Sequence, residues 1–118
     1  MPVVNLKEKL AHITDHWLPK PVAAVNDYDV RLVKIEGEFV RHSHADSDEF
    51  FLVIDGEMTI RMDDGEVVLR SGECYVVPKG TPHQPYAEHE CAVMIFEPSG
   101  TVNTGDAGGP MTAARQLF

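Results

Sequence analysis

The chain has 118 residues, and 19 Asp and Glu residues outnumber 10 Lys and Arg residues, which gives a formal net charge of -9. Proteins that bind nucleic acid cluster basic residues to neutralise phosphates. The basic residues here are scattered, so we predict no nucleic-acid partner. No apolar run approaches the ~20 residues that span a bilayer, so we also predict no membrane association.

The length suits one domain, and the composition suits a cytoplasmic protein. The N-terminal residues mix charged side chains into the apolar ones and lack the continuous apolar stretch of a signal peptide. In a reducing compartment we expect Cys74 and Cys91 to be free thiols, although two cysteines on neighbouring strands could form a disulfide.

The first predicted element is an amphipathic α-helix at about residues 5–17. Apolar side chains recur at the spacing of one helix face, at Leu6, Leu10, Ile13 and Trp17. Asn5 can cap the N-terminus of this helix, and Pro19 follows its end. We expect the apolar face to pack on the main body of the protein or on a second subunit.

From about residue 22 to residue 97 the pattern changes to short β-type runs divided by turns. The runs are rich in Val, Ile, Phe and Tyr and lie at Asp29–Glu36, Phe39–His44, Glu49–Ile54, Glu57–Met62, Glu66–Arg70, Cys74–Val77 and Cys91–Glu97. Asp-Gly pairs between such runs, as at Asp55-Gly56, are strong hairpin signals. The pattern predicts an all-β antiparallel sandwich or barrel.

The run from Phe50 to Ile54 is apolar on both faces. One face of such a strand can pack into a small barrel, so the other face needs a second layer, either the N-terminal helix or another subunit. We predict a homodimer. Residues 98–118 are rich in Gly, Ser and Thr and are predicted to form a loop and a C-terminal tail, in which Met111 to Phe118 forms a short helix or frays.

Three histidines and one glutamate fall near predicted strand ends. His42 and His44 are two residues apart, so on a strand both imidazoles point to one face. Glu49 follows a short turn and can return to the same side, and His83 follows a stiff segment that begins at Pro78. Such a mixed nitrogen and oxygen set suits Fe, Mn, Ni, Co or Zn and fits Ca or Mg poorly. Each element alone is weak: the two histidines could lie on a surface strand by chance, and His83 could be an ordinary loop histidine.

Together these residues form two motifs that resemble those of the cupin superfamily. The first is Gly37-x4-His42-x-His44-x4-Glu49-x6-Gly56, and the second is Gly72-x5-Pro78-x-Gly80-x2-His83. The first motif is one residue shorter than the usual family pattern between Gly37 and His42, and Ala87 stands where the second commonly ends in Asn. The resemblance implies a double-stranded β-helix, or jelly-roll barrel, in which His42, His44, Glu49 and His83 bind one divalent transition metal.

Four protein ligands leave one or two positions open on a metal that prefers five or six, so we expect a small-molecule ligand there. We predict a small metal-dependent enzyme, either a dioxygenase or an isomerase or lyase, that acts on an oxygen-bearing metabolite. Small cupins are similar to the metal-binding core of mannose-6-phosphate isomerase, but no phosphate-binding element is evident here. The alternative is a cupin that binds or senses a metabolite without converting it. Candidate catalytic residues are Gln84, Tyr86 and Lys34, although none is a convincing general base.

Overall fold

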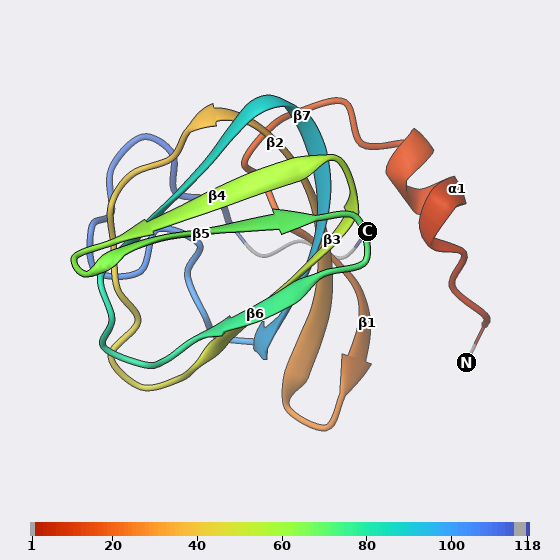
Figure 1. Cartoon of the computed structure of the whole chain (residues 1–118). Coiled ribbons are helices and arrows are strands. Elements are labelled where there is room, and N and C mark those ends of the chain that lie inside the picture. The colour runs from red at the N-terminus through yellow and green to blue at the C-terminus, as the bar shows by residue number, and fades with distance from the viewer. Residues whose placement is uncertain (1, 115–117) are drawn as a thin grey trace.

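Seven antiparallel strands and one short helix make up the structure, a computed structural model that describes residues 2–114 and 118. The helix is α1 (Leu6–Ala11), and the strands are β1 (Lys20–Val25), β2 (Tyr28–Glu38), β3 (Glu49–Asp55), β4 (Glu57–Met62), β5 (Gly65–Arg70), β6 (Cys74–Val77) and β7 (His83–Pro98). The strands wrap into a barrel, with α1 outside it (Figure 1). The predicted all-β fold with a short N-terminal helix is confirmed.

The long strand β7 holds the barrel together because it joins both layers. Its second half, Cys91–Pro98, lies between β2 and β3, and its first half pairs with β4 at residues 83–86. The strand order is β1-β2-β7-β3-β6, and the β4–β5 hairpin attaches to β7. This winding is the predicted double-stranded β-helix. It places His83, at the start of β7, beside the segment that connects β2 to β3.

Alternate side chains of each strand fill the barrel, as the period of two requires. The core cluster consists of Val33, Ile35, Phe51, Val53, Met58, Ile60, Leu69, Val77, Ala87, Cys91, Val93 and Ile95. Full burial of one such aliphatic side chain contributes roughly 1.5–3 kcal/mol to folding. Both cysteines are free: Cys74 is exposed and Cys91 is buried.

The predicted helix is wrong in its extent, because α1 ends at Ala11 and does not reach residue 17. Asn5 caps it as expected, since its side-chain oxygen accepts a hydrogen bond from the backbone N–H of Glu8 at 2.9 Å. Trp17 instead has a left-handed backbone (φ 65°) and stacks on Phe39 of the barrel. Packing of the indole on the barrel therefore overrides the helical spacing. Among the described residues no helix has the length and apolar character needed to cross a membrane.

Two further boundaries differ from the prediction. Phe39–His44 is not a strand: it forms only an isolated bridge between His42 and His83. The expected loop around His83 is instead the start of β7. Residues 99–113 form the predicted loop without a helix, whereas the expected helix or frayed tail at Met111–Phe118 lies largely outside the described residues.

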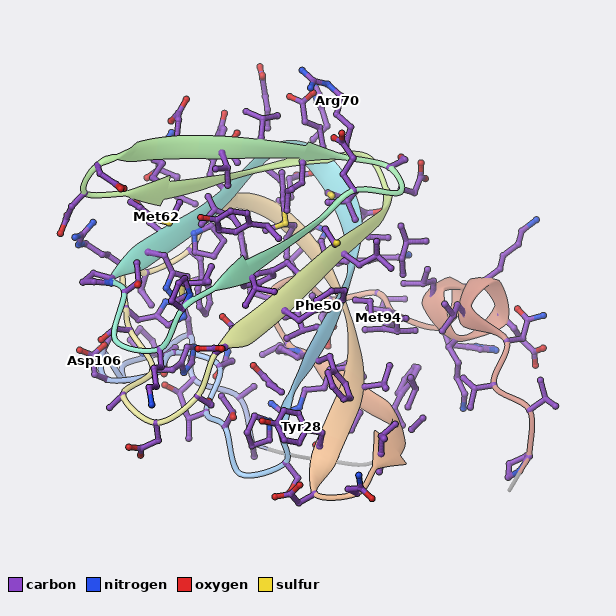
Figure 2. The ribbon with its side chains drawn as sticks, turned by 60° about the horizontal axis from the view of Figure 1, so that its bottom comes forward. Tyr28, Phe50, Met62, Arg70, Met94 and Asp106 are labelled. Atoms are coloured by element: carbon purple, nitrogen blue, oxygen red, sulfur yellow. The ribbon has the colours of Figure 1, made fainter. Side chains whose placement is uncertain are left out.

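The outer face of the β3–β7–β2 layer is apolar. Phe50 and Leu52 of β3 lie opposite Phe96 and Met94 of β7, and all four side chains are half-buried. Figure 2 shows Phe50 and Met94 on this layer. Helix α1 meets the layer only at its edge, where Leu10 helps to line a groove with Ala92. Within the described residues, most of this face therefore has no second layer.

Candidate metal centre

The four predicted ligands come together inside one end of the barrel. One ligand atom each from His42, His44, Glu49 and His83 lies within 4.8 Å of all the others, and all four residues are buried. Two backbone hydrogen bonds join His42 to His83, with N···O distances of 3.0 and 2.8 Å. They fix the segment between β2 and β3 against the start of β7. These two hydrogen bonds bring the residues of the two motifs together, although residues 39–44 do not form the predicted strand.

Backbone carbonyls set the tautomers of two imidazoles. Nδ1 of His42 lies 2.9 Å from the Val40 carbonyl, and Nδ1 of His83 lies 2.9 Å from the Thr81 carbonyl. A carbonyl oxygen only accepts, so each Nδ1 donates its proton and each neutral ring keeps a lone pair on Nε2. Burial lowers the pKa of His42 to about 4, so this ring is neutral at pH 7.

The Nε2 atoms face a carboxylate. Nε2 of His83 lies 3.2 Å from Oε1 of Glu49, and Nε2 of His44 lies 3.4 Å from the same oxygen and has no hydrogen-bond partner. An Nε2 lone pair and a carboxylate oxygen that face each other repel, and a cation bound between them would remove this repulsion. Three imidazole nitrogens and one carboxylate oxygen are a donor set typical of transition metals. The residues present therefore fit the predicted divalent metal.

A second buried carboxyl group lies beside Glu49. Glu97 is its neighbour across the β3–β7 pairing, because Phe50 lies opposite Phe96. Burial, and next the contact with Glu49, raise the pKa of Glu97 to about 10. Burial also acts to raise the pKa of Glu49, but its contacts with Glu97, His44 and His83 hold that pKa well below its usual range. At neutral pH Glu97 is therefore a neutral acid that donates to the Glu49 carboxylate.

Arg31 holds Glu97 from the other side. Its Nη1 donates to Oε2 of Glu97 at 3.0 Å, and its Nε and Nη2 donate to Oδ2 of Asp29 at 3.3 and 3.1 Å. The guanidinium also donates to the carbonyls of Thr101 and Ser99 at 2.9 and 2.8 Å. Since Glu97 is neutral, Asp29 supplies the charge that balances Arg31. The guanidinium thus donates all of these hydrogen bonds within one buried cluster.

The raised pKa of Glu97 predicts how the stability of the metal-free protein depends on pH. The folded state keeps this proton up to pH about 10, whereas the unfolded chain releases it near the usual value of 4.5. The folded state thus binds more protons, and the free energy of unfolding falls as pH rises through this window. His42 has the opposite effect only below pH 6.5, where its unfolded imidazole is protonated. Urea unfolding between pH 7 and 10 measures the slope.

The variant Glu97→Gln should flatten that slope. Its amide keeps one acceptor for Arg31 and one donor for Glu49 but cannot titrate. A slope of the same size in Glu97→Gln would show that another group causes it.

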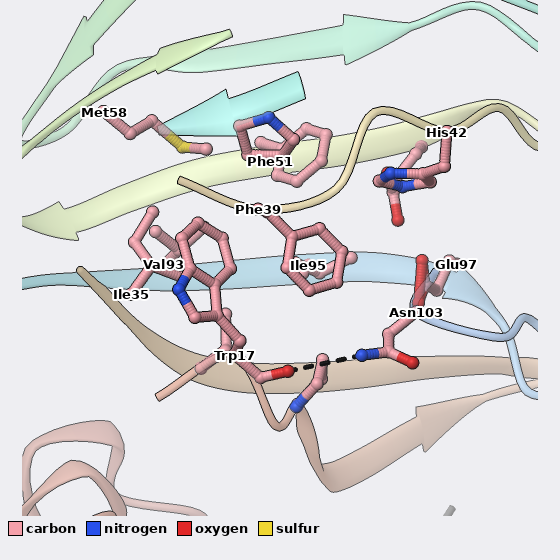
Figure 3. A pocket seen from close by; sticks show the side chains of 14 residues that line it. Trp17, Ile35, Phe39, His42, Phe51, Met58, Val93, Ile95, Glu97 and Asn103 are labelled. Atoms are coloured by element: carbon pink, nitrogen blue, oxygen red, sulfur yellow. Dashed lines mark hydrogen bonds between the residues drawn. The ribbon is translucent and has the colours of Figure 1, made fainter. Parts of the chain in front are cut away.

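The metal-ligand group opens into an apolar pocket (Figure 3). The walls are Trp17, Pro19, Val33, Ile35, Phe39, His42, Glu49, Phe51, Met58, Pro85, Val93, Ile95, Glu97 and Asn103. The free space between them is about 430 Å³, including the part open to solvent. His42 and Glu97 lie at one end of the pocket, and Met58 and Val93 lie at the other (Figure 3).

The candidate catalytic residues lie outside this pocket. Gln84 donates from its side chain to the Phe39 carbonyl at 3.0 Å, and the ring of Tyr86 lies under the Arg61 guanidinium. Lys34 lines a groove beside α1. None of the three lines the pocket, so the roles predicted for them at the metal remain without structural support.

The sequence reasoning missed Arg31, Glu97, Trp17 and Asn103. For the first two a signal was present: Arg31 shares strand parity with the buried Val33, and Glu97 shares parity with the buried Ile95. A charged residue at an inward position should have been considered as a buried partner. No local signal identifies Trp17 or Asn103, because long-range packing places them.

The loop after β7 supports the backbone of the metal site. Asp106 accepts hydrogen bonds from the backbone N–H and the hydroxyl of Ser43, the residue between two candidate ligands, at 2.8 and 3.1 Å. Gly105 passes so close that an added Cβ would overlap the Ser43 carbonyl oxygen and lie 3.0 Å from Cδ2 of His42. The loop therefore fixes His42 from outside the barrel.

We expect Gly105→Ala to displace this loop and to destabilise the protein by about 1–3 kcal/mol. It should also weaken metal binding, because His42 loses its support. Gly108→Ala is the matched control: both glycines have similar φ values (54° and 60°), but an added Cβ at Gly108 meets nothing within 4 Å. Urea unfolding and metal titration of both variants test this. Equal effects of the two substitutions would contradict the role given to the close approach.

Comparisons with known proteins agree with this geometry. Residues 30–97 match the cupin domain family. The chain belongs to the cupin family. A cupin-2 domain protein of known structure from Shewanella frigidimarina is 48% identical, with a TM-score of 0.80 over 81% of this chain and 94% of that one.

Two curated cupin relatives come from Bacillus subtilis. YdbB is 40% identical over 81 residues, which are 68% of this chain and 66% of YdbB. Quercetin 2,3-dioxygenase is 40% identical over 65 residues, which are 54% of this chain and 19% of the dioxygenase. This cupin thus spans less than two thirds of each of these relatives.

Proposed function

We propose that this cupin is a metal-dependent dioxygenase that acts on a small, oxygen-bearing metabolite. The observation that carries the proposal is the buried group of His42, His44, Glu49 and His83 at the polar end of an apolar pocket. The likeness to quercetin 2,3-dioxygenase supports a dioxygenase over an isomerase or lyase. An isomerase or lyase activity, and a likeness to the core of mannose-6-phosphate isomerase, stay predictions.

In this proposal the four side chains hold one divalent Fe, Mn, Ni, Co or Zn ion. A redox-active ion of this group would supply the binding of O2 and the activation of a bound substrate oxygen. The chain supplies the surroundings. The carbonyls of Val40 and Thr81 keep two Nε2 lone pairs turned inward. Glu97 stabilises the ionised form of Glu49, and the apolar walls exclude water.

Oxygen uptake tests the proposal. Untagged protein loaded with Fe(II) is mixed with a panel of phenols, diketones and thiols, and O2 consumption and products are measured. We expect uptake with at least one class and its loss in His83→Ala. His89→Ala is the control, because His89 is an exposed histidine on the same strand. If Fe(II)-loaded protein consumes no O2 with any member of the panel, the proposed activity is wrong.

A second candidate function is binding of a metabolite without conversion. One observation favours it: Lys34, Gln84 and Tyr86 all lie outside the pocket, so among the described residues the pocket lining adds none of the predicted catalytic groups to the carboxyl pair. In that case a ligand should stabilise the metal-loaded protein in thermal-shift measurements and be recovered unchanged.

We also propose that the apolar face of the β3–β7–β2 layer is the homodimer interface. Phe50, Leu52, Met94 and Phe96 form a patch that a second copy would bury. Sedimentation should show a dimer, and Met94→Lys should shift it to the monomer; a wild-type monomer at micromolar concentration would contradict the proposal.

The exposed free thiol of Cys74 fits a reducing cytoplasm, which cell fractionation tests.

A further inference from the structure

The pocket beside the metal-ligand group meets solvent at the segment between α1 and β1. In the part of the chain that the structure describes, 14 residues line the pocket, and all of them are buried except Trp17 and Pro19, which are half-exposed. Both of these residues belong to that segment. The entrance to the pocket therefore lies beside Trp17.

The other walls of the pocket are held by backbone hydrogen bonds. Most of their residues lie on β2, β3, β4 and β7, which are paired with neighbouring strands. Phe39 and His42 follow β2 and are joined to β7. The N–H of Phe39 donates to the Pro85 carbonyl at 3.0 Å, and His42 exchanges two hydrogen bonds with His83. An opening through these walls would break hydrogen bonds of the barrel, which is costly.

The backbone of Trp17 is fixed in a left-handed conformation. Its φ of 65° is rare for a bulky residue and costs free energy, whereas glycine would adopt it without strain. The N–H of Trp17 donates to the Lys34 carbonyl at 2.9 Å, and its carbonyl accepts from the Asn103 amide at 3.3 Å. Nε2 of the preceding His16 lies 2.7 Å from Oε2 of Glu90 on β7. Because strained residues cluster at functional sites, the placement of an indole here points to a function.

The side chain of Trp17 is held less firmly than its backbone. The indole N–H donates to the Glu36 carbonyl at 2.9 Å, and the ring stacks on Phe39 with centroids 4.8 Å apart and planes 19° apart (Figure 3). The half-buried indole also packs against the core cluster. Rotation of the indole would give up these contacts but would break no bond between strands, so it is the least costly way to open the pocket.

The ring of Phe39 connects the indole to the metal-ligand group. It contacts the imidazole of His42 edge to face, with centroids 5.4 Å apart. Trp17, Phe39 and His42 thus form a row of three rings that leads from the half-exposed indole to a candidate ligand. Movement of the outermost ring would uncover the row from the solvent side.

We propose that the indole of Trp17 is a gate between solvent and the metal-ligand group. In the closed state, which is the state described above, the indole lies on Phe39 and covers the entrance. In the open state it rotates away from Phe39 while the backbone of residue 17 keeps its hydrogen bonds, and a solute can reach Nε2 of His42. The gate is a property of the metal-free chain, so it goes beyond the proposed function and does not depend on it.

Modification of histidines by diethyl pyrocarbonate tests the gate in metal-free protein. This small neutral reagent transfers an ethoxycarbonyl group to a neutral imidazole nitrogen and releases ethanol and carbon dioxide. Peptide mass spectrometry gives the initial rate at each histidine. The exposed His89 is the internal reference in every variant.

Three variants are compared with the wild type. Trp17→Ala removes the indole, and Trp17→Phe keeps a ring beside Phe39 but loses the hydrogen bond to the Glu36 carbonyl. Leu18→Ala is the matched control, because Leu18 is a half-buried neighbour in the same segment that does not line the pocket. Circular dichroism shows whether each variant is folded.

We expect His42 of the wild type to react far more slowly than His89. Trp17→Ala should raise the rate at His42 at least about tenfold, because the stacking contact and the hydrogen bond no longer keep the entrance closed. Trp17→Phe should raise this rate less, and Leu18→Ala should leave it unchanged. An unchanged rate at His42 in a folded Trp17 variant, or an equal increase in Leu18→Ala, would overturn the inference.

Zinc binding separates a gate from a structural contact. A gate changes the rates of zinc uptake and release together, so both should rise in Trp17→Ala while Kd stays within about threefold of the wild type. A Kd raised about tenfold or more at an unchanged rate of uptake would show that Trp17 only supports the ligands. If the wild type takes up no zinc, the proposed metal-dependent function fails, and the rates at His42 still decide whether Trp17 is a gate.

Discussion

Replacement of His83 by alanine should lower the affinity for a divalent metal by about a hundredfold or more. A four-ligand site of this kind binds zinc with roughly 10–16 kcal/mol, so one ligand accounts for several kcal/mol. His83 is also the ligand that joins β7 to the other three, through its bridge to His42 and its Nε2 contact with Glu49. Competition with a chromophoric chelator measures the affinity.

His89→Ala is again the matched control, because it removes an exposed imidazole from the same strand and should leave the affinity unchanged. Circular dichroism of both variants shows whether the barrel is retained. A folded His83→Ala protein that binds metal as tightly as the wild type would exclude His83 as a ligand.

The second large effect should come from Arg31. We expect Arg31→Met to destabilise the protein by about 3–5 kcal/mol, which is the usual effect of breaking a buried ion pair by removal of one member. The Asp29 side chain is 1% exposed and would lose its 3.1 Å ion pair with Arg31. The loop after β7 would also lose its hydrogen bonds at Ser99 and Thr101. Urea unfolding measures the change.

Arg61→Met is the control for Arg31→Met. Arg61 pairs with Glu38 on the surface, where both side chains are at least 39% exposed. Exposed pairs contribute about 0–1 kcal/mol, so this variant should remain close to the wild type. If the two substitutions cost the same, the buried cluster does not stabilise the fold as described.

The barrel and its metal-ligand group could be predicted because local patterns carry them. Alternating apolar residues and Asp-Gly turns mark the hairpins, and the spacing of His42, His44, Glu49 and His83 marks the two motifs. The prediction of the metal-ligand group is supported although one predicted strand was wrong. Phe39–His44 is not a strand, but the bridge between His42 and His83 brings the imidazoles together by a different route.

The pocket walls could not be predicted, because contacts distant in sequence bring them together. Trp17 has the spacing of a helical residue, yet its carbonyl contacts Asn103, 86 residues later, and its ring lies on Phe39. Arg31 and Glu97 are 66 residues apart and meet only because β2 and β7 pair. Such a match between strands depends on register, which single runs of residues do not specify.

The most direct test of the central claim is the metal content of untagged protein after purification and titration with Fe(II), Mn(II), Co(II), Ni(II) and Zn(II). The geometry of His42, His44, Glu49 and His83 predicts about one equivalent of one of these ions per chain. Less than about 0.1 equivalent, with no uptake of any of the five ions, would contradict the account.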